Sequence, residues 1–160
     1  MPTSRLIVLA ILALSAASLA AAEVKDVAYP EGYRFWTHVK SASIDPPSPA
    51  FAHFGGIHHI YANKAAMTGY RTGKFADGAV LVFDVLEWKA SPGATASGAR
   101  RIVDVMERDK RFAATGGWGF TEFRGDSHTE RAIGADNPAA ACAACHAKAP
   151  HDGVFSTFAP

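Results

Sequence analysis

The stretch Ala79-Val-Leu-Val-Phe-Asp-Val-Leu-Glu-Trp88 contains the strongest strand signal in the chain. It is rich in branched and aromatic residues and ends just before the turn-forming sequence Ser91-Pro-Gly93, as strands commonly do. Side chains alternate between the two faces of a strand, so Leu81, Phe83 and Val85 are expected to share one face. The fold is therefore expected to be organised around a buried strand here.

Four further segments on either side of this stretch also have strand character. A proline-rich loop at Asp45–Pro49 must be irregular, because proline donates no backbone hydrogen bond. The segments are separated by long loops without regular alternation of strands and helices, which favours an antiparallel sheet over a parallel one. The sequence thus predicts an α+β, mainly β fold, with an antiparallel sheet flanked by short helices. The additional strands are expected at His38–Ile44, Ile57–Tyr61, Arg101–Glu107 and Trp118–Phe123.

Two helices have recognisable start signals. Asn63 is placed to cap a helix over Lys64–Tyr70. Nearer the C-terminus, Asn137 as N-cap and Pro138 at the first helical position predict a helix over Ala139–Lys148.

The N-terminus has the order of a secretory signal. A single positive charge in Met1–Arg5 precedes an apolar run over Leu6–Leu14, and small residues then lead to Glu23. A transmembrane anchor would need about 20 apolar residues, which this segment does not supply. We expect residues 1–22 to be a signal peptide removed before Glu23, and residues 23–160 to form a single domain that does not remain in a membrane.

Charge limits the possible partners of the mature chain. Removing residues 1–22 deletes one basic residue, Arg5, so the 16 basic residues become 15 and balance the 15 acidic ones. Binding to nucleic acid or to an anionic membrane would call for a basic patch that displaces counterions. A near-neutral chain argues against both as main partners.

The motif Cys142-Ala-Ala-Cys145-His146 carries the clearest chemistry. Its thiols lie about one helical turn apart, so each can add to one haem vinyl group while the histidine coordinates the iron. A redox dithiol has no need of the histidine, and zinc would require further ligands of a kind the chain lacks, since it has only two cysteines. A disulfide would close too small a loop to restrict the unfolded chain much. The motif predicts one covalent haem c, with His146 as the metal ligand.

The sixth iron position decides between electron transfer and ligand binding. Met67 and Met106 are interpreted as core residues, as methionines in such places commonly are. His58 and His59 are adjacent on a strand, so one should face the core and the other should not. The sequence does not exclude a histidine ligand, and the remaining candidates near loops or segment ends are His38, His53, His128 and His151.

An ordered set of segments along the mature chain resembles the cytochrome P-460 family. The resemblance implies a mainly antiparallel β fold with helices, a periplasmic homodimer, and a haem whose distal side is open. The segments that carry it are Gly32-Tyr-Arg-Phe-Trp36, Gly55-Gly-Ile-His-His-Ile-Tyr61, Tyr70-Arg-Thr-Gly-Lys-Phe-Ala-Asp-Gly-Ala-Val80, Arg111-Phe112 before Gly116-Gly-Trp118, Cys142–His146, and Val154-Phe-Ser-Thr-Phe158.

Two departures from the hydroxylamine-oxidising members of that family concern the haem surroundings. Those members join a lysine to the haem edge a few residues after a segment that here reads Phe75-Ala-Asp-Gly78, and the matching position is Phe83. They also use a carboxylate that assists proton removal, which should fall near Ile102–Asp104, with Val103 the best match. Both departures make the chain resemble the cytochrome c′-beta branch, whose phenylalanine-capped pocket binds nitric oxide and carbon monoxide.

The resemblance therefore implies a gas-binding protein with Phe83 and Phe54 in its distal pocket. Hydroxylamine or nitric oxide oxidoreduction and electron transfer remain the alternatives. A phenyl cap offers no hydrogen bond, so neutral diatomic gases are favoured over polar ligands. The other lysines considered as cross-linkers are interpreted as solvated surface residues, and they are Lys40, Lys64, Lys74 and Lys89.

Overall fold

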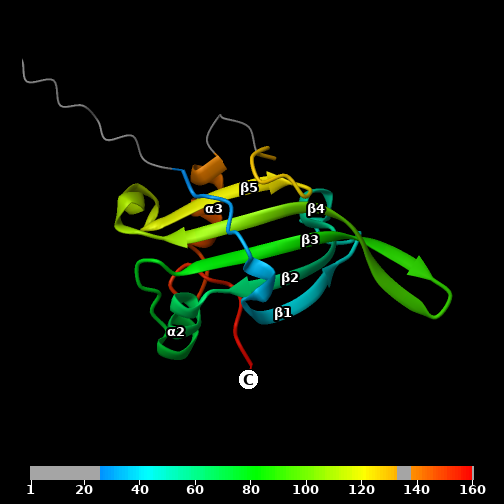
Figure 1. Cartoon of the computed structure of the whole chain (residues 1–160), viewed down its shortest axis with the longest axis horizontal. Helices are drawn as coiled ribbons and strands as arrows, with labels where there is room; N and C mark the ends of the chain where they lie inside the picture. The colour runs from blue at the N-terminus through cyan, green and yellow to red at the C-terminus, as the bar shows by residue number, and fades with distance from the viewer. Residues whose placement is uncertain (1–25, 133–137, 160) are drawn as a thin grey trace, which may run out of the picture.

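A computed structural model describes the backbone of residues 26–132 and 138–159. Its centre is one antiparallel sheet of five strands in the order β1-β2-β3-β4-β5, so each strand pairs with its neighbours in sequence (Figure 1). The strands are β1 (Thr37–Ile44), β2 (Gly56–Ala62), β3 (Val80–Ser91), β4 (Ala94–Arg108) and β5 (Trp118–Arg124). The predicted fold class, mainly β with short helices, is confirmed.

Strands β3 and β4 are longer than expected. Their paired segments beyond Leu86 form a two-stranded ribbon that projects from the sheet (Figure 1). Gly93, at the tip, has the positive φ of 70° that a tight turn requires and that glycine adopts without strain. The sequence prediction ended at Trp88 and resumed at Arg101, because the small and polar residues between them lack strand character.

Five short helical segments flank the sheet in the described part of the chain. The Asn63 side chain accepts a hydrogen bond from the Ala66 amide at 2.9 Å, which confirms the predicted cap of α2. Segments α1 and η2 were not predicted, because each is short and has no apolar period. Asn137 lies outside the described residues. The segments are η1 (Tyr33–Phe35), α1 (Phe51–Phe54), α2 (Lys64–Thr72), η2 (Lys110–Thr115) and α3 (Pro138–His146).

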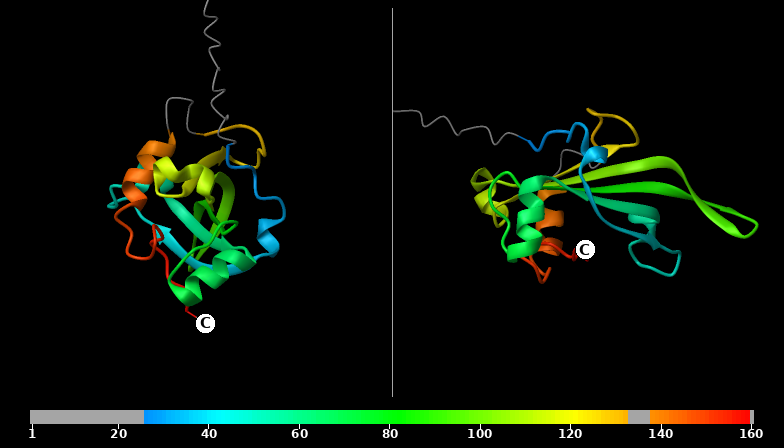
Figure 2. Two further views of the ribbon diagram at one scale, coloured as in Figure 1. Left: turned by 90° about the vertical axis from the view of Figure 1, so that its left-hand side faces the viewer. Right: turned by 60° about the horizontal axis from the view of Figure 1, so that its bottom comes forward.

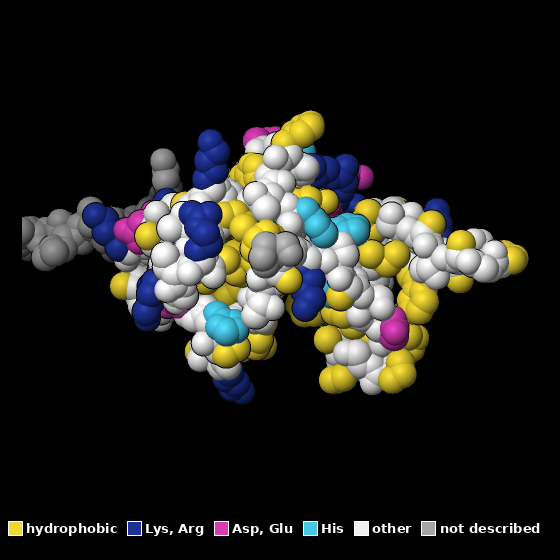
Figure 3. Space-filling model, turned by 90° about the horizontal axis from the view of Figure 1, so that it is seen from below, with side chains coloured by type: hydrophobic (Ala, Val, Ile, Leu, Met, Phe, Trp, Pro, Cys, Tyr) yellow, Lys and Arg dark blue, Asp and Glu magenta, His cyan; other side chains and the backbone are white. Residues whose placement is uncertain are grey.

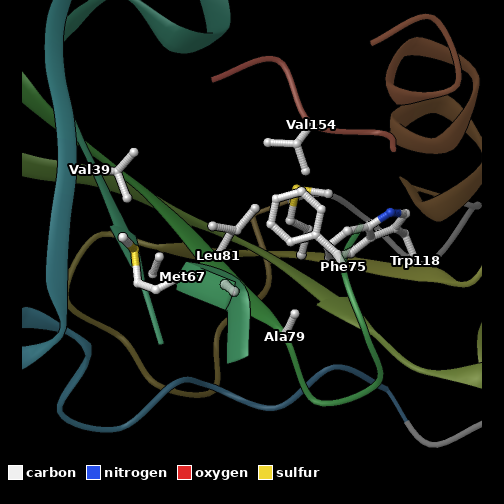
Figure 4. Close-up of a cluster of buried hydrophobic side chains, with 10 residues drawn as sticks. Val39, Met67, Phe75, Ala79, Leu81, Trp118 and Val154 are labelled. Carbon is white, nitrogen blue, oxygen red and sulfur yellow. The ribbon is translucent and has the colours of Figure 1, made fainter. Parts of the chain in front are cut away.

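The sheet is covered on both faces. One apolar cluster joins α2, the C-terminal segment and the face that carries Leu81 (Figure 4), and it also contains Met67 and Met106. These two methionines are therefore core residues, as interpreted from the sequence. The second cluster lies on the opposite face, where Val82 and Val103 pack against the segment around Tyr33. We call these the α3 face and the N-terminal face.

Candidate functional site

The three residues of the predicted haem motif lie together on α3. Cys142 and Cys145 are both free thiols, and His146 ends the helix. The Nδ1 atom of His146 lies 2.8 Å from the carbonyl oxygen of Gly153. A carbonyl oxygen can only accept, so Nδ1 must carry the proton and donate. This contact fixes the ring and leaves the Nε2 lone pair available for a metal.

The turn that supplies the Gly153 carbonyl is held from two sides. Trp118 Nε1 donates to the Asp152 carbonyl at 2.8 Å, and the Asp152 carboxylate accepts from the Phe75 amide at 2.9 Å. Gly153 has a φ of 86°, and an added Cβ would lie 2.9 Å from the Trp118 ring. Residue 153 must therefore be glycine, for reasons of both backbone conformation and space.

Aromatic rings flank His146. The ring centroids of Phe120, from β5, and Phe155, from the C-terminal segment, lie 5.0 and 5.2 Å from that of the imidazole. The imidazole therefore contacts one ring from the sheet and one from the C-terminal segment.

Phe83 and Phe54, the two predicted pocket residues, are in contact with each other. Phe83 comes from β3 and Phe54 from α1, and their ring centroids lie 5.8 Å apart in an edge-to-face arrangement. His58 of β2 stacks on Phe83 at 4.4 Å. The three rings form one aromatic wall, although α1 was not predicted to bring Phe54 there.

The aromatic wall and α3 lie on the same side of the sheet. Figure 2 (right panel) shows α3 and the 45–55 segment beneath the sheet, at different places along it. The surface on this side is hollowed between two lobes in Figure 3. The structure thus brings the haem motif and the predicted distal residues to one face, with a hollow between their elements.

Two carboxyl groups lie on this face. Asp104 ends the range Ile102–Asp104 in which the resemblance places the family carboxylate, whereas Glu122 was not predicted. Asp104 pairs with Phe83 across β3 and β4, and Glu122 pairs with Asp104 across β4 and β5. Directly opposite residues project from the same face, so all three share it. Val103, the residue matched to the family carboxylate, packs in the cluster on the N-terminal face instead. The register of β3 and β4 places Asp104, and not Val103, on the face of Phe83, and alternation within one strand could not make that choice.

Glu122 is buried and is bonded to α1. Its Oε2 atom lies 2.6 Å from His53 Nε2, and its side chain is 1% exposed compared with 47% for His53. The other oxygen, Oε1, is buried without a hydrogen-bond partner among the described residues, and so is Nδ1 of His58. Buried polar atoms in folded proteins are almost always satisfied. Both atoms lie on the α3 face and have room for a further hydrogen-bond donor or acceptor.

Burial shifts the pKa values of several groups around the hollow. Burial, followed by the neighbouring Glu122, raises the pKa of Asp104 well above its ordinary value. Burial and the charges of Asp104 and Glu122 raise the pKa of the Cys142 thiol to about 11. The Cys142 thiol thus lies within electrostatic reach of both carboxyls. Burial lowers the pKa of His58, which favours its neutral form.

The other candidate ligands lie away from the hollow or at the surface. His59 takes part in a chain of hydrogen bonds in which Ser41 Oγ lies 2.6 Å from its Nδ1 and 2.8 Å from His38 Nε2. His128 stacks on Tyr29, and His151 is exposed. The four lysines are exposed as well, which confirms their surface interpretation: Lys40, Lys64, Lys74 and Lys89.

Two searches of the described residues gave negative results. No three histidine, cysteine or carboxylate side chains are grouped there so that they could hold a metal ion. Within the same residues, no helix has both the length and the apolar character to cross a membrane.

The chain matches the family described as Cytochrome P460 over residues 30–156, which include the strands, the aromatic wall and the haem motif. The chain belongs to the Cytochrome P460 family. Membership implies a haem cofactor. No individual curated protein matched the chain.

The residues on the α3 face fit a Cytochrome P460 haem. The Gly153 carbonyl oxygen orients the imidazole of His146, two free thiols lie within one helical turn, and an aromatic wall lies on the same face of the sheet. The unpartnered atoms of His58 and Glu122 are on this same face. Cys142 and Cys145 would hold the haem vinyl groups and His146 the iron, and the haem would supply a redox-active iron that binds small ligands.

Proposed function

We propose that the protein is an exported mono-haem c-type cytochrome whose five-coordinate iron binds nitric oxide and carbon monoxide. The observation that supports this is the position of Phe83 in the aromatic wall with Phe54 and His58. Phe83 occupies the place that the family resemblance assigns to the cross-linking lysine. A phenyl ring cannot form that bond, so the haem edge is expected to stay unmodified there.

An aromatic wall also suits neutral diatomic ligands. Phe83 and Phe54 offer no hydrogen-bond donor, so a polar or anionic ligand gains little there to offset its lost hydration. Met67 and Met106, the candidate thioether ligands, are packed in the core. These placements support a vacant sixth position with His146 as the sole axial protein ligand.

Absorption and resonance Raman spectra of the purified protein test this function. We expect high-spin, five-coordinate haem in both oxidation states and new bands when carbon monoxide or nitric oxide is added. Mass spectrometry should find one haem joined through the two cysteines and no lysine adduct. A six-coordinate, low-spin spectrum at neutral pH would support the electron-transfer alternative instead.

Hydroxylamine oxidation is the second candidate, and the Asp104–Glu122 pair favours it. Oxidising hydroxylamine releases protons, and paired carboxyls beside the pocket could accept them. The discriminating measurement is steady-state turnover of hydroxylamine with an artificial electron acceptor. The gas-binding proposal predicts slow or absent turnover and no strongly red-shifted ferrous band, and turnover at rates usual for enzymes would contradict it.

Export and assembly complete the proposal. The signal-like residues 1–22 lie outside the described residues, and their sequence supports cleavage before Glu23 and delivery to the periplasm. N-terminal sequencing of the exported protein should begin at Glu23. A homodimer is proposed from the family resemblance, and light scattering should give twice the monomer mass.

A further inference from the structure

A line of hydrogen-bonding and titratable groups leads from the surface to the aromatic wall. His53 is half exposed and lies 2.6 Å from Glu122, which is buried. Glu122 faces Asp104 across the β4–β5 ladder, and Asp104 faces Phe83 across the β3–β4 ladder. The line therefore ends beside the aromatic wall and near Cys142.

The Oε1 atom of Glu122 lacks a hydrogen-bond donor, and a protonated neighbouring carboxyl group could be that donor. Its Oε2 atom is bonded to His53, whereas Oε1 is buried and has no partner in the described part of the chain. The opposite carboxyl group, on Asp104, can donate only when it is protonated. Two adjacent carboxyls in a desolvated place hold one proton between them more readily than two negative charges. The raised pKa of Asp104 agrees with this arrangement.

We propose that Asp104 and Glu122 share a proton whose binding is linked to the oxidation state of the haem, and that His53 exchanges this proton with solvent. This inference rests on a haem being bound in the hollow, but not on which ligand it binds. It assigns to three residues of this chain a role that gas binding alone does not require.

The linkage follows from charge. When a one-electron donor outside the protein reduces the iron, the haem gains one electron and loses one positive charge. The carboxyl pair then binds a proton more tightly, because the nearby positive charge that opposed protonation is gone. One electron enters from the donor and one proton enters from solvent through His53. Reoxidation releases both.

Other groups near the carboxyl pair come from α3, β4, α1 and β3. Cys142, from α3, becomes an uncharged thioether once the haem is attached. Arg101, from β4, donates to the carbonyl oxygens of Ala52 and Gly55 in the segment that carries His53. Phe83 and Phe54 are uncharged. The propionates of the haem also titrate, so variants of the carboxyl pair are needed to assign the effect.

The first experiment measures the midpoint potential of the wild-type holoprotein against pH by spectroelectrochemistry. We expect the potential to fall as pH rises, with the ferric-to-ferrous ratio changing by up to tenfold per pH unit, or about 59 mV for one electron. Reduced-minus-oxidised infrared spectra should show a protonated-carboxyl band that gains intensity on reduction and shifts in D₂O. A pH-independent potential without a carboxyl band would overturn the proposal.

Variants then assign the proton to these residues. Glu122→Gln and Asp104→Asn keep the side-chain shapes, and each should flatten the pH dependence and remove the infrared band. Glu130→Gln is the matched control, because Glu130 is 62% exposed and pairs with Arg124 near the same strand, and it should change neither. If both carboxyl variants keep the wild-type pH dependence of the potential and the infrared band, the proton belongs to the propionates. That result would contradict the proposal.

His53→Gln tests the route. Glutamine can still donate to Glu122 but cannot relay a proton, so re-equilibration after a pH jump at fixed potential should slow by about tenfold or more. An unchanged rate would remove His53 from the proposal. Carbon monoxide binding, recorded on the same samples, reports separately on the proposed gas-binding function. If one of the two carboxyl variants does not fold, the infrared difference spectrum of the other still decides whether the band belongs to the Asp104–Glu122 pair.

Discussion

The two faces of the sheet use the same strands but are completed in different ways. On the N-terminal face, the buried Asp84 accepts hydrogen bonds from Tyr33 at 2.8 Å and from Arg100 at 2.6 Å, within a closed apolar cluster. On the α3 face, the buried Glu122 has one oxygen without a partner among the described residues. The comparison teaches that one buried carboxylate can have all its hydrogen bonds supplied by the protein, while another keeps an oxygen free for a further group.

The largest expected effect comes from removing the attachment points on the α3 face. In Cys142→Ala combined with Cys145→Ala, no thioether bond can form, and covalent haem should be lost entirely. Haem staining after denaturing electrophoresis and intact mass measure this. A variant that still held haem through denaturation would contradict the assignment of both cysteines.

A substitution on the N-terminal face is expected to lower stability without removing haem. Asp84→Ala leaves Arg100, whose side chain is 6% exposed, without its buried partner, and should cost about 3–5 kcal/mol in the free energy of unfolding. Asp126→Asn is the control, because Asp126 also pairs with Arg100 but is 79% exposed, and should cost about 1 kcal/mol or less. Urea unfolding measures both. Carbon monoxide binding should be unchanged in each.

Replacing one phenylalanine on each face tests the same difference between the two faces. Phe83→Ala should speed carbon monoxide binding and admit water, because it removes part of the aromatic wall. Phe112→Ala, in the cluster on the N-terminal face, should cost about 3–5 kcal/mol of stability and leave ligand binding rates unchanged. Flash photolysis and urea unfolding provide the two readouts. Equal binding rates in wild type and Phe83→Ala would show that Phe83 does not face the ligand.

The smallest expected effect is on the pH dependence of stability. The pKa of Asp104 is raised in the folded state, so folded protein holds a proton that unfolded protein releases above the ordinary aspartate pKa of about 4. The unfolding free energy should therefore fall as pH rises through the raised value. Asp104→Asn should flatten this decline in urea titrations. A decline of the same size in that variant would assign it to other groups.

Local sequence patterns predicted much of the fold and one side of the site. Branched residues identified β3, Asn63 identified the start of α2, and Pro138 identified the start of α3, because each signal lies within a few neighbouring residues. Alternation placed Phe83 on one face, and the resemblance paired it with Phe54. What could not be predicted depends on register between strands. Register brings Asp104 beside Phe83 and places Glu122 next to it, and neither strand carries that information alone.

Asp84 illustrates the same limit. A charged residue inside the most apolar strand has no local explanation, and its partner Arg100 follows 16 residues later, beyond the hairpin ribbon. The short segment α1 was missed for a different reason. Its four residues carry no helical period, and its position is fixed by contacts with β3 and β5 through Phe54 and His53.

The order of the strands along the chain has a consequence for how the molecule is made. All five strands pair with sequence neighbours and precede α3, so the sheet needs nothing from residues 138–159 to form its ladders. Synthesis delivers the N-terminal part first. The sheet can therefore form before α3 is packed against it, which would leave the two thiols accessible for the proposed attachment of haem. Docking of the C-terminal segment, which brings Gly153 to His146, would then come last.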